Sequence, residues 1–352
     1  MAPPESAAPS ASLRWPAEWE PHEATWLAWP HKETSWPGKF DRIPPVFVEM
    51  VRALVPGERV EILVRDEAME AAVATRLAEA RVAGADVRLH RLPTDDAWIR
   101  DHGPTFVVDE AVGELVAVDW DYNAWGGKYP PWDTDALVAG RVATLVGCPT
   151  RRPGLILEGG SIEGDGEGTL LTTESCLLNR NRNPALDRAA IEQHLRAALG
   201  VSAILWLGDG IAGDDTDGHV DDLTRFVAPG RVVTVLEGDP RDVNYNTLRA
   251  NHERLVTLRD ARGRQLEVIP LPMPAPVLEG EDRLPASYAN FYIGNEAVLV
   301  PVFGCSADRE ALGLLGELFP GRRVTAIPAR DLVWGLGACH CLSQQQPRAP
   351  AR

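Results

Sequence analysis

Short runs rich in Val, Ile and Leu alternate along the chain with longer stretches in which apolar residues recur at helical spacing. Because the short runs have strand length and the longer stretches have helix length, the pattern predicts repeated strand and helix units and an α/β fold. The predicted strands cover residues 60–64, 86–92, 104–108, 115–120, 169–173, 203–207, 231–236, 266–271, 297–303 and 323–329. The predicted helices cover about 45–54, 67–83, 133–147, 186–197, 243–259 and 308–319.

The domain organisation follows from the absence of a long linker in the middle of the sequence. A proline cluster at residues 270–276 is short and lies between predicted strands, so we expect one domain from residue 13 to residue 347. Units of strand and helix recur every ~60 to 70 residues, but their sequences are too different to identify a repeat. Residues 1–12 are rich in Pro, Ala and Ser, and we expect a disordered tail there and a second short tail at 348–352.

Composition narrows the classes of function. Hydrophobic residues make up 45% of the chain and charged residues 24%, as in an ordinary globular protein with a large core. Lys and Arg number 35 against 51 Asp and Glu, and the formal charge of −16 repels nucleic acid and anionic lipid while attracting small cations. The acidic excess is also compatible with a role in solubility alone. Neither nucleic acid nor a membrane is an expected partner, and assembly into a homo-oligomer stays open.

Cysteine usage indicates the cellular compartment. The five cysteines are an odd number without the spacing of a disulfide framework, so we expect free thiols and a cytoplasmic protein.

The segment GDDTDGHVDDLTRF (213–226) has the densest chemistry. Asp217, His219 and Asp221 alternate, so in extended chain they share one face. A histidine between two carboxylates is suited to general acid and base catalysis beside groups that hold a cation. The same residues are equally compatible with a solvated acidic loop or with a metal site.

The segment WGLGACHCLSQQQP (334–347) places Cys341 after a glycine-rich stretch that allows a substrate to approach closely. A thiolate there is a plausible nucleophile for a guanidinium carbon. The run Cys339, His340, Cys341 also suggests zinc, although the cysteines are closer than in usual zinc motifs and no second pair exists.

Two further segments, TDDAWIRDHGP (94–104) and LILEGGSIEGDGEGT (155–169), put the carboxylates of Asp96 and Glu158 beside aromatic or glycine-rich chain, where an ordinary turn is an equal alternative. Trp98, Trp125 and Trp132 are candidates to flank a flat cation, although most of the 11 tryptophans must be structural.

Taken together, the motifs carry a resemblance. The segments LRWPAEWEPHEATWLAWP, DDAWIRDHGPTFVV, NAWGG, PPWD, LEGGSIEGDGEGTLLTTESCLLNRNRNP, DDTDGHVDDLTRF, SYANFYIGN and HCLSQQQP resemble, in order, those of agmatine deiminases and the related bacterial-type peptidylarginine deiminases. The resemblance runs from Leu13 to Pro347. It implies a single-domain α/β propeller of the pentein type with five pseudo-symmetric units, and a cofactor-free and metal-free hydrolase acting on a small cationic guanidinium substrate.

The resemblance also implies residue roles. Asp96 and Asp221 would hold the guanidinium nitrogens, Glu158 and His219 would form the acid and base pair, and Cys341 would form a covalent thiouronium intermediate. The implied reaction converts agmatine and water into N-carbamoylputrescine and ammonia, a step toward putrescine.

The ending GLGACHC departs from the usual GGGNIHC of agmatine deiminases, because Leu336, Ala338 and Cys339 replace Gly, Asn and Ile. This departure leaves the fit of the substrate tail open. Three alternatives therefore remain: a peptidylarginine or free-arginine deiminase, a metal-dependent hydrolase or metal-binding protein, and a non-catalytic binding module.

Overall fold

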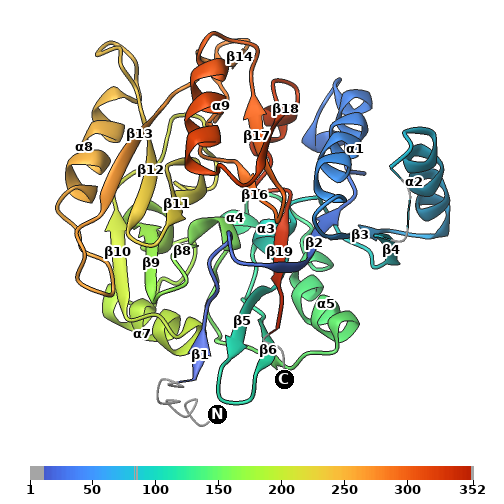
Figure 1. The fold of residues 1–352 in the computed structure, drawn as a ribbon, viewed down its shortest axis with the longest axis horizontal. Helices are drawn as coiled ribbons and strands as arrows, with labels where there is room; N and C mark the ends of the chain where they lie inside the picture. The colour runs from blue at the N-terminus through green and yellow to red at the C-terminus, as the bar shows by residue number, and fades with distance from the viewer. Residues whose placement is uncertain (1–11, 83, 85, 350–352) are drawn as a thin grey trace.

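The computed structural model describes residues 12–82, 84 and 86–349 (Figure 1). Residues 1–11 of the expected N-terminal tail and residues 350–352 of the expected C-terminal tail lie outside this part of the chain. Within the described part, no helix is both long and apolar enough to cross a bilayer.

Among the described residues, five sheets of three or four strands and one two-stranded hairpin carry the fold. In hydrogen-bonding order the sheets are β19 (Gln344–Pro347), β2 (His22–Ala28), β3 (Arg59–Val64) and β4 (Val87–Arg91); β1 (Leu13–Arg14), β5 (Thr105–Asp109), β6 (Glu114–Val118) and β7 (Thr150–Arg151); β10 (Ala203–Leu207), β9 (Thr169–Thr173) and β8 (Glu163–Gly164); β11 (Thr224–Ala228), β12 (Arg231–Leu236) and β13 (Glu267–Pro272); and β16 (Tyr292–Ile293), β17 (Ala297–Val302) and β18 (Arg323–Pro328). The hairpin is formed by β14 (Leu278–Glu279) and β15 (Asp282–Arg283). Each larger sheet contains one strand that pairs antiparallel with one neighbour and parallel with the other.

Helices connect the parallel strands, because a tight turn cannot join two strands that run in the same direction. These helices are α1 (Ile43–Leu54), α2 (Glu67–Glu79), α5 (Val138–Val146), α7 (Arg188–Leu199), α8 (Tyr245–Leu255) and α9 (Ala307–Leu318). They lie around the outside of the molecule, whereas the short helices α3 (Ile99–His102) and α4 (Ala124–Gly127) lie near its centre (Figure 1). The remaining short elements are α6 (Glu174–Leu177), η1 (Glu33–Ser35), η2 (Phe40–Arg42), η3 (Asp135–Leu137), η4 (Gly159–Ser161), η5 (Val220–Asp222) and η6 (Leu332–Gly335).

Every strand and helix expected from the hydrophobic pattern is present, with small differences at the ends. The helix expected at 67–83 ends at Glu79, and the one expected at 133–147 begins as the 3-10 turn η3 before α5. Local chemistry explains several boundaries. The carboxylate of Asp66 accepts a hydrogen bond from the amide of Met69 at 2.9 Å and so caps the start of α2.

Strands in the middle of the sheets are buried almost throughout their length. All five residues of β9 are buried, and five of the six residues of β17 are buried. Short elements at the strand ends carry the polar residues. The turn η4 packs against both α3 and η5, so residues far apart in the sequence meet near the centre of the molecule.

Candidate active site

Cys341 lies at one wall of a cavity of about 970 Å³. Asp96, Asp101, Trp98 and Trp125 line the same cavity. The cysteine side chain is 5% exposed, so the thiol is nearly covered in the absence of a ligand. The structure thus places the expected nucleophile in a cavity with carboxylates and aromatic rings.

The thiol of Cys341 has one neutral and several acidic neighbours. The side-chain amide of Asn290 donates to Sγ at 3.0 Å, and Sγ lies 3.7 Å from Oδ2 of Asp221. Burial raises the pKa of the thiol well above its ordinary value, and Asp221, Asp222 and Asp101 raise it further. A positive charge bound in the cavity would favour the thiolate.

The backbone next to Cys341 is held close by small residues. A Cβ on Gly337 would lie 3.2 Å from Sγ of Cys341 and 2.7 Å from the ring of Trp98, so a larger side chain there would force one of them to move.

His219 and Glu158 form a buried ion pair. Nε2 of the histidine lies 3.6 Å from Oε2 of Glu158, and Arg182 donates to Oε1 of the same carboxylate at 2.8 Å. Burial favours the uncharged carboxyl, but the charges of Arg182 and His219 outweigh it and lower the pKa of Glu158. Burial alone would lower the pKa of His219, yet Asp101, Cys176 and Glu158 raise it well above its ordinary value. His219 is therefore an imidazolium suited to donate a proton.

Asp221 is fully buried and is bound on one side only. Its Oδ2 lies 2.6 Å from Nδ1 of His340. Burial raises the pKa of Asp221, but the His340 contact outweighs burial and the pKa is lowered. Among the described residues, Oδ1 of Asp221 has no hydrogen-bond partner. This oxygen is available to accept an N–H group from a ligand.

Asp101, which the sequence motifs did not single out, lies beside His219. Its Oδ1 is 3.8 Å from Nδ1 of the histidine, and its carboxylate accepts from Trp125 Nε1 at 2.9 Å and from Gly160 N at 3.0 Å. A Cβ on Gly160 would lie 2.7 Å from His219 Nδ1, 2.9 Å from Asp101 Oδ1 and 3.0 Å from Asp221 Oδ2. The side chains of His219, Asp101 and Asp221 therefore converge around one glycine.

The other candidate, Asp96, lines the cavity in a different setting. Ser35 donates to its Oδ2 at 2.6 Å, the amide of Ala97 donates to Oδ1 at 2.8 Å, and Lys32 lies 3.5 Å from Oδ2. Both aspartates accept hydrogen bonds from protein donors, but Asp101 also lies 3.8 Å from His219 and raises the pKa of Cys341. The resemblance suggested Asp96 as a carboxylate that holds the guanidinium nitrogens, and the geometry favours Asp101 for that role. Both aspartates belong to the same segment, DDAWIRD.

The three tryptophans occupy different places. Trp98 and Trp125 line the cavity, and Trp125 has a left-handed backbone with φ of 57°. Trp132 packs against the main hydrophobic core and is not among the described residues that line the cavity. Leu336, which departs from the usual glycine, also lines the cavity and has φ of 70°, a region that favours glycine.

The cationic residues of the cavity wall are all paired with acids. Arg283 binds the Asp242 carboxylate through two contacts of 2.7 and 2.8 Å, and Lys128 lies 2.9 Å from Asp217. Lys32, the third cation of the described cavity wall, pairs with Asp96 as described above. Acidic side chains are more numerous on this wall: Asp96, Asp101, Asp214, Asp215, Glu279, Glu281 and Asp282. The cavity is electrostatically suited to a cation.

The described part of the chain contains one group of side chains that could bind a metal ion. Glu158, Cys176 and His219 are buried with ligand atoms within 4.8 Å of one another. The Cys-His-Cys run does not form a second group, because both ring nitrogens of His340 face carboxylates and Cys341 contacts Asn290.

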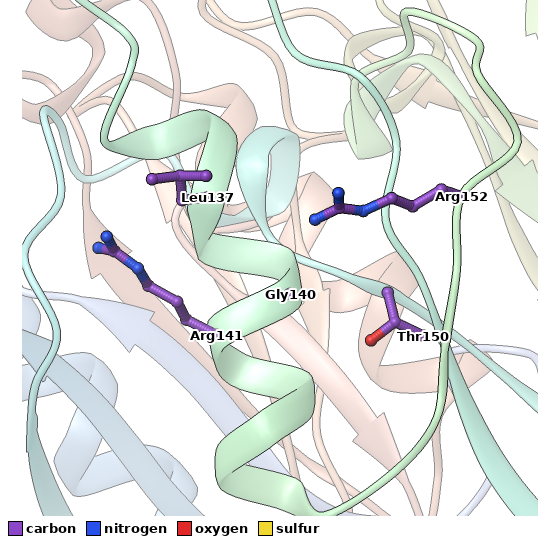
Figure 2. Close-up of a pocket in the computed structure, with 5 residues that line it drawn as sticks. All are labelled: Leu137, Gly140, Arg141, Thr150 and Arg152. Atoms are coloured by element: carbon purple, nitrogen blue, oxygen red, sulfur yellow. The ribbon is translucent and has the colours of Figure 1, made fainter.

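A second concavity lies at the surface between α5 and β7, away from these residues (Figure 2). Leu137, Gly140, Arg141, Thr150 and Arg152 line it, and Nε of Arg152 is 2.8 Å from Oδ2 of Asp119. It contains neither a nucleophile nor an acid and base pair, so the cavity at Cys341 is the candidate active site.

Comparison with known proteins identifies the family of the chain. The family model described as Porphyromonas-type peptidyl-arginine deiminase matches residues 14–347. The chain belongs to this family. It is 41% identical to an agmatine deiminase of Ectopseudomonas mendocina over 94% of this chain and 95% of the relative, and 42% identical to one of Stutzerimonas stutzeri with the same coverage. A solved agmatine deiminase of Enterococcus faecalis superposes with a TM-score of 0.89 at 34% identity, covering 96% of this chain and 97% of that one. The family and the mixed α/β fold class expected from the sequence are confirmed.

Proposed function

We propose that this protein is a hydrolytic deiminase that converts agmatine and water into N-carbamoylputrescine and ammonia. The observation that carries the proposal is the convergence of the Cys341 thiol with Asp221, Asp101 and His219 at an acidic cavity. Relatives of about 40% identity over nearly the whole chain are named agmatine deiminases, which supports the same assignment.

In the proposed complex, the planar guanidinium lies between Asp101 and Asp221 and donates N–H groups to both carboxylates. The substrate also neutralises the two carboxylates that raise the pKa of Cys341, so binding itself favours the thiolate. The two carboxylates orient the central carbon toward Sγ.

The reaction then proceeds in two steps. Cys341 attacks the guanidinium carbon, the C–N bond to one terminal nitrogen breaks, and His219 donates the proton with which ammonia leaves. Neutral His219 next takes a proton from water, the hydroxide adds to the S-alkylthiouronium carbon, and the C–S bond breaks. The products are the ureido compound and a regenerated thiol, and Glu158 keeps His219 in place throughout.

The choice of agmatine over arginine rests on the paired cations of the cavity wall. Arginine carries an α-carboxylate, and a buried carboxylate without a partner costs several kcal/mol, on the order of the desolvation penalty of one ion. Among the described wall residues, Lys32, Lys128 and Arg283 all have acidic partners. A second ammonium group, as in agmatine, instead meets an acidic surface.

The wider proposals concern architecture and location. We propose that residues 13–347 form one domain built as a five-unit propeller, supported by the strand pattern shared by the five larger sheets. Free cysteines in the described structure support a cytoplasmic location.

The test compares kcat/KM for agmatine, arginine, a peptide-blocked arginine and a methylated arginine, with ammonia release as the readout and Cys341→Ala as the blank. The proposal expects agmatine to be preferred by at least roughly tenfold. Preference for blocked arginine would keep the chemistry and reject the agmatine assignment. No release from any guanidine would reject the deiminase itself.

A further inference from the structure

A line of buried side chains behind Asp221 has no part in the steps above. Nδ1 of His340 lies 2.6 Å from Oδ2 of Asp221, and Nε2 lies 2.8 Å from Oε2 of Glu18, a residue 322 positions away in the sequence. Glu18, His340 and Asp221 are 5%, 1% and 0% exposed. Both ring nitrogens of one buried imidazole therefore face carboxylates.

The geometry of the two contacts favours one form of the ring. Only an imidazolium can donate from both nitrogens, whereas a neutral ring would leave one nitrogen lone pair facing a carboxylate. Glu18 is held as an anion by an ion pair with Arg225, whose Nη2 lies 2.9 Å away, and by hydrogen bonds from Arg100 Nη2 at 3.3 Å and from the amide of Ile293 at 2.8 Å. Burial raises the pKa of Glu18, but Arg225, His340 and Arg100 outweigh it and hold the pKa well below the ordinary value.

The line ends at the carboxylate of Asp221, which lies 3.7 Å from the Cys341 thiol. His340 occupies Oδ2 of Asp221, and Oδ1 is the oxygen left without a partner in the described structure. His340 also precedes Cys341, and its backbone carbonyl accepts from Arg100 Nε at 3.3 Å. Arg100 thus links Glu18 to the backbone that carries the nucleophile.

We propose that Glu18 and His340 are positioning residues for the reaction: Glu18 holds His340 as a doubly protonated imidazolium, and His340 fixes Asp221 with Oδ1 directed at the guanidinium. The inference rests on the proposed deiminase function. It assigns a task in the active site to a residue at the other end of the chain.

A purely structural role for the buried charges is the competing explanation, and Glu163 provides the matched control. This carboxylate is 4% exposed and binds Arg225 Nε at 3.0 Å, so it belongs to the same network as Glu18. It makes no described hydrogen bond or ion pair with His340 or Asp221. Glu163→Gln therefore removes a nearby charge of the same network while leaving both contacts of the His340 ring in place.

The kinetic arm compares Glu18→Ala, Glu18→Gln and Glu163→Gln with the wild type, on agmatine or on whichever guanidine the wild type turns over best. Glu18→Ala releases the ring, and kcat/KM is expected to fall on the order of 100-fold, as for a misplaced catalytic group. Glu18→Gln keeps a side chain of the same shape and should restore part of the loss, to roughly 10-fold, whereas Glu163→Gln should stay within about threefold. Equal losses for Glu18→Gln and Glu163→Gln, with matching falls in unfolding temperature, would overturn the proposal.

The spectroscopic arm does not depend on turnover. In protein labelled with ¹⁵N-histidine, which has 8 histidines, His340→Gln identifies the His340 signals. Both ring nitrogens are expected to carry protons at neutral pH in the wild type, and only one in Glu18→Gln. A neutral His340 ring in the wild type would overturn the inference even if deimination is confirmed. An imidazolium in a protein that turns over no guanidine would reject the proposed function and, with it, the positioning role.

Discussion

Replacement of Asp101 by asparagine is the sharpest test of the active-site geometry, because the motif match alone pointed to Asp96. Asp101 lies 3.8 Å from His219 Nδ1 and accepts from Trp125 and Gly160, whereas Asp96 is engaged by Ser35 and Ala97. Asparagine keeps the size of the side chain and removes the negative charge. We expect Asp101→Asn to impair turnover far more than Asp96→Asn.

The magnitude follows from the hydrogen bonds at stake. A guanidinium can donate two N–H groups to one carboxylate, and hydrogen bonds to charged groups contribute about 1.5–3 kcal/mol each. The amide oxygen of the introduced asparagine can retain one acceptor contact without the charge, so a loss of about 3 kcal/mol is reasonable, which is roughly 150-fold in kcat/KM. Asp96→Asn should cost less than about fivefold, because Asp96 lies outside the group that His219, Asp101 and Asp221 form around Gly160.

The assay is steady-state ammonia release from agmatine by both variants, with circular dichroism and thermal unfolding to confirm that each is folded. A folded Asp101→Asn protein that keeps more than about one third of wild-type kcat/KM would refute the reasoning. So would an Asp96→Asn loss as large as that of Asp101→Asn.

The remaining predictions concern the thiols, the histidine, metals and the strained loop. Cys341→Ala should abolish turnover while Cys339→Ala retains most of it, since Cys339 is fully buried and does not line the described cavity wall; the reverse result in ammonia release would move the nucleophile. His219→Ala should lower kcat by ~100- to 10,000-fold, and normal turnover would exclude it as the acid. Without substrate, alkylation of Cys341 by iodoacetamide should be slow at neutral pH and faster toward alkaline pH. Burial and Asp221 raise the pKa of the thiol, so its neutral, unreactive form persists below that pKa. An alkylation rate that does not change with pH would contradict this. EDTA should leave activity unchanged, and a loss that a defined metal restores would require a different mechanism. Leu336→Gly should raise the free energy of unfolding by roughly 1 kcal/mol in a denaturant titration. A left-handed Leu costs ~1–2 kcal/mol, and the greater chain entropy that glycine loses on folding offsets part of the gain. A lower free energy of unfolding would show that the contacts of the leucine side chain matter more.

The hydrophobic pattern was sufficient for the regular elements and insufficient for those around the active site. A strand such as β17 is a continuous apolar run and is buried almost throughout, so the hydrophobic pattern reveals it. By contrast, β19 reads QQQP and is fully buried, because it pairs with β2 and because Gln345 and Gln346 accept from Arg100 and Trp26. A polar strand of this kind has no signal in a hydrophobic pattern.

The site was predictable where a motif joined unusual residue types, and not where function depends on long-range contacts. Cys341 and His219 stood out by their neighbours in sequence. Asp101, Glu18 and Asn290 did not, since each looks like a surface residue until the fold brings it against His219, His340 or Cys341. One signal for Asp101 was available: it lies in the same motif as Asp96, so the motif itself offers both aspartates as alternatives.

The pairing of β19 with β2 has a consequence for the order of events on the ribosome. Cys341 follows every other proposed site residue in the chain and lies just before β19, whose partner strand β2 stands far earlier in the sequence. A nascent chain can build its helices and local sheets as it emerges, but closure between its two ends waits until the C-terminal strand leaves the exit tunnel. The reactive thiol is thus delivered after the pocket that receives it, and a product arrested before residue 341 would be catalytically silent rather than partly active.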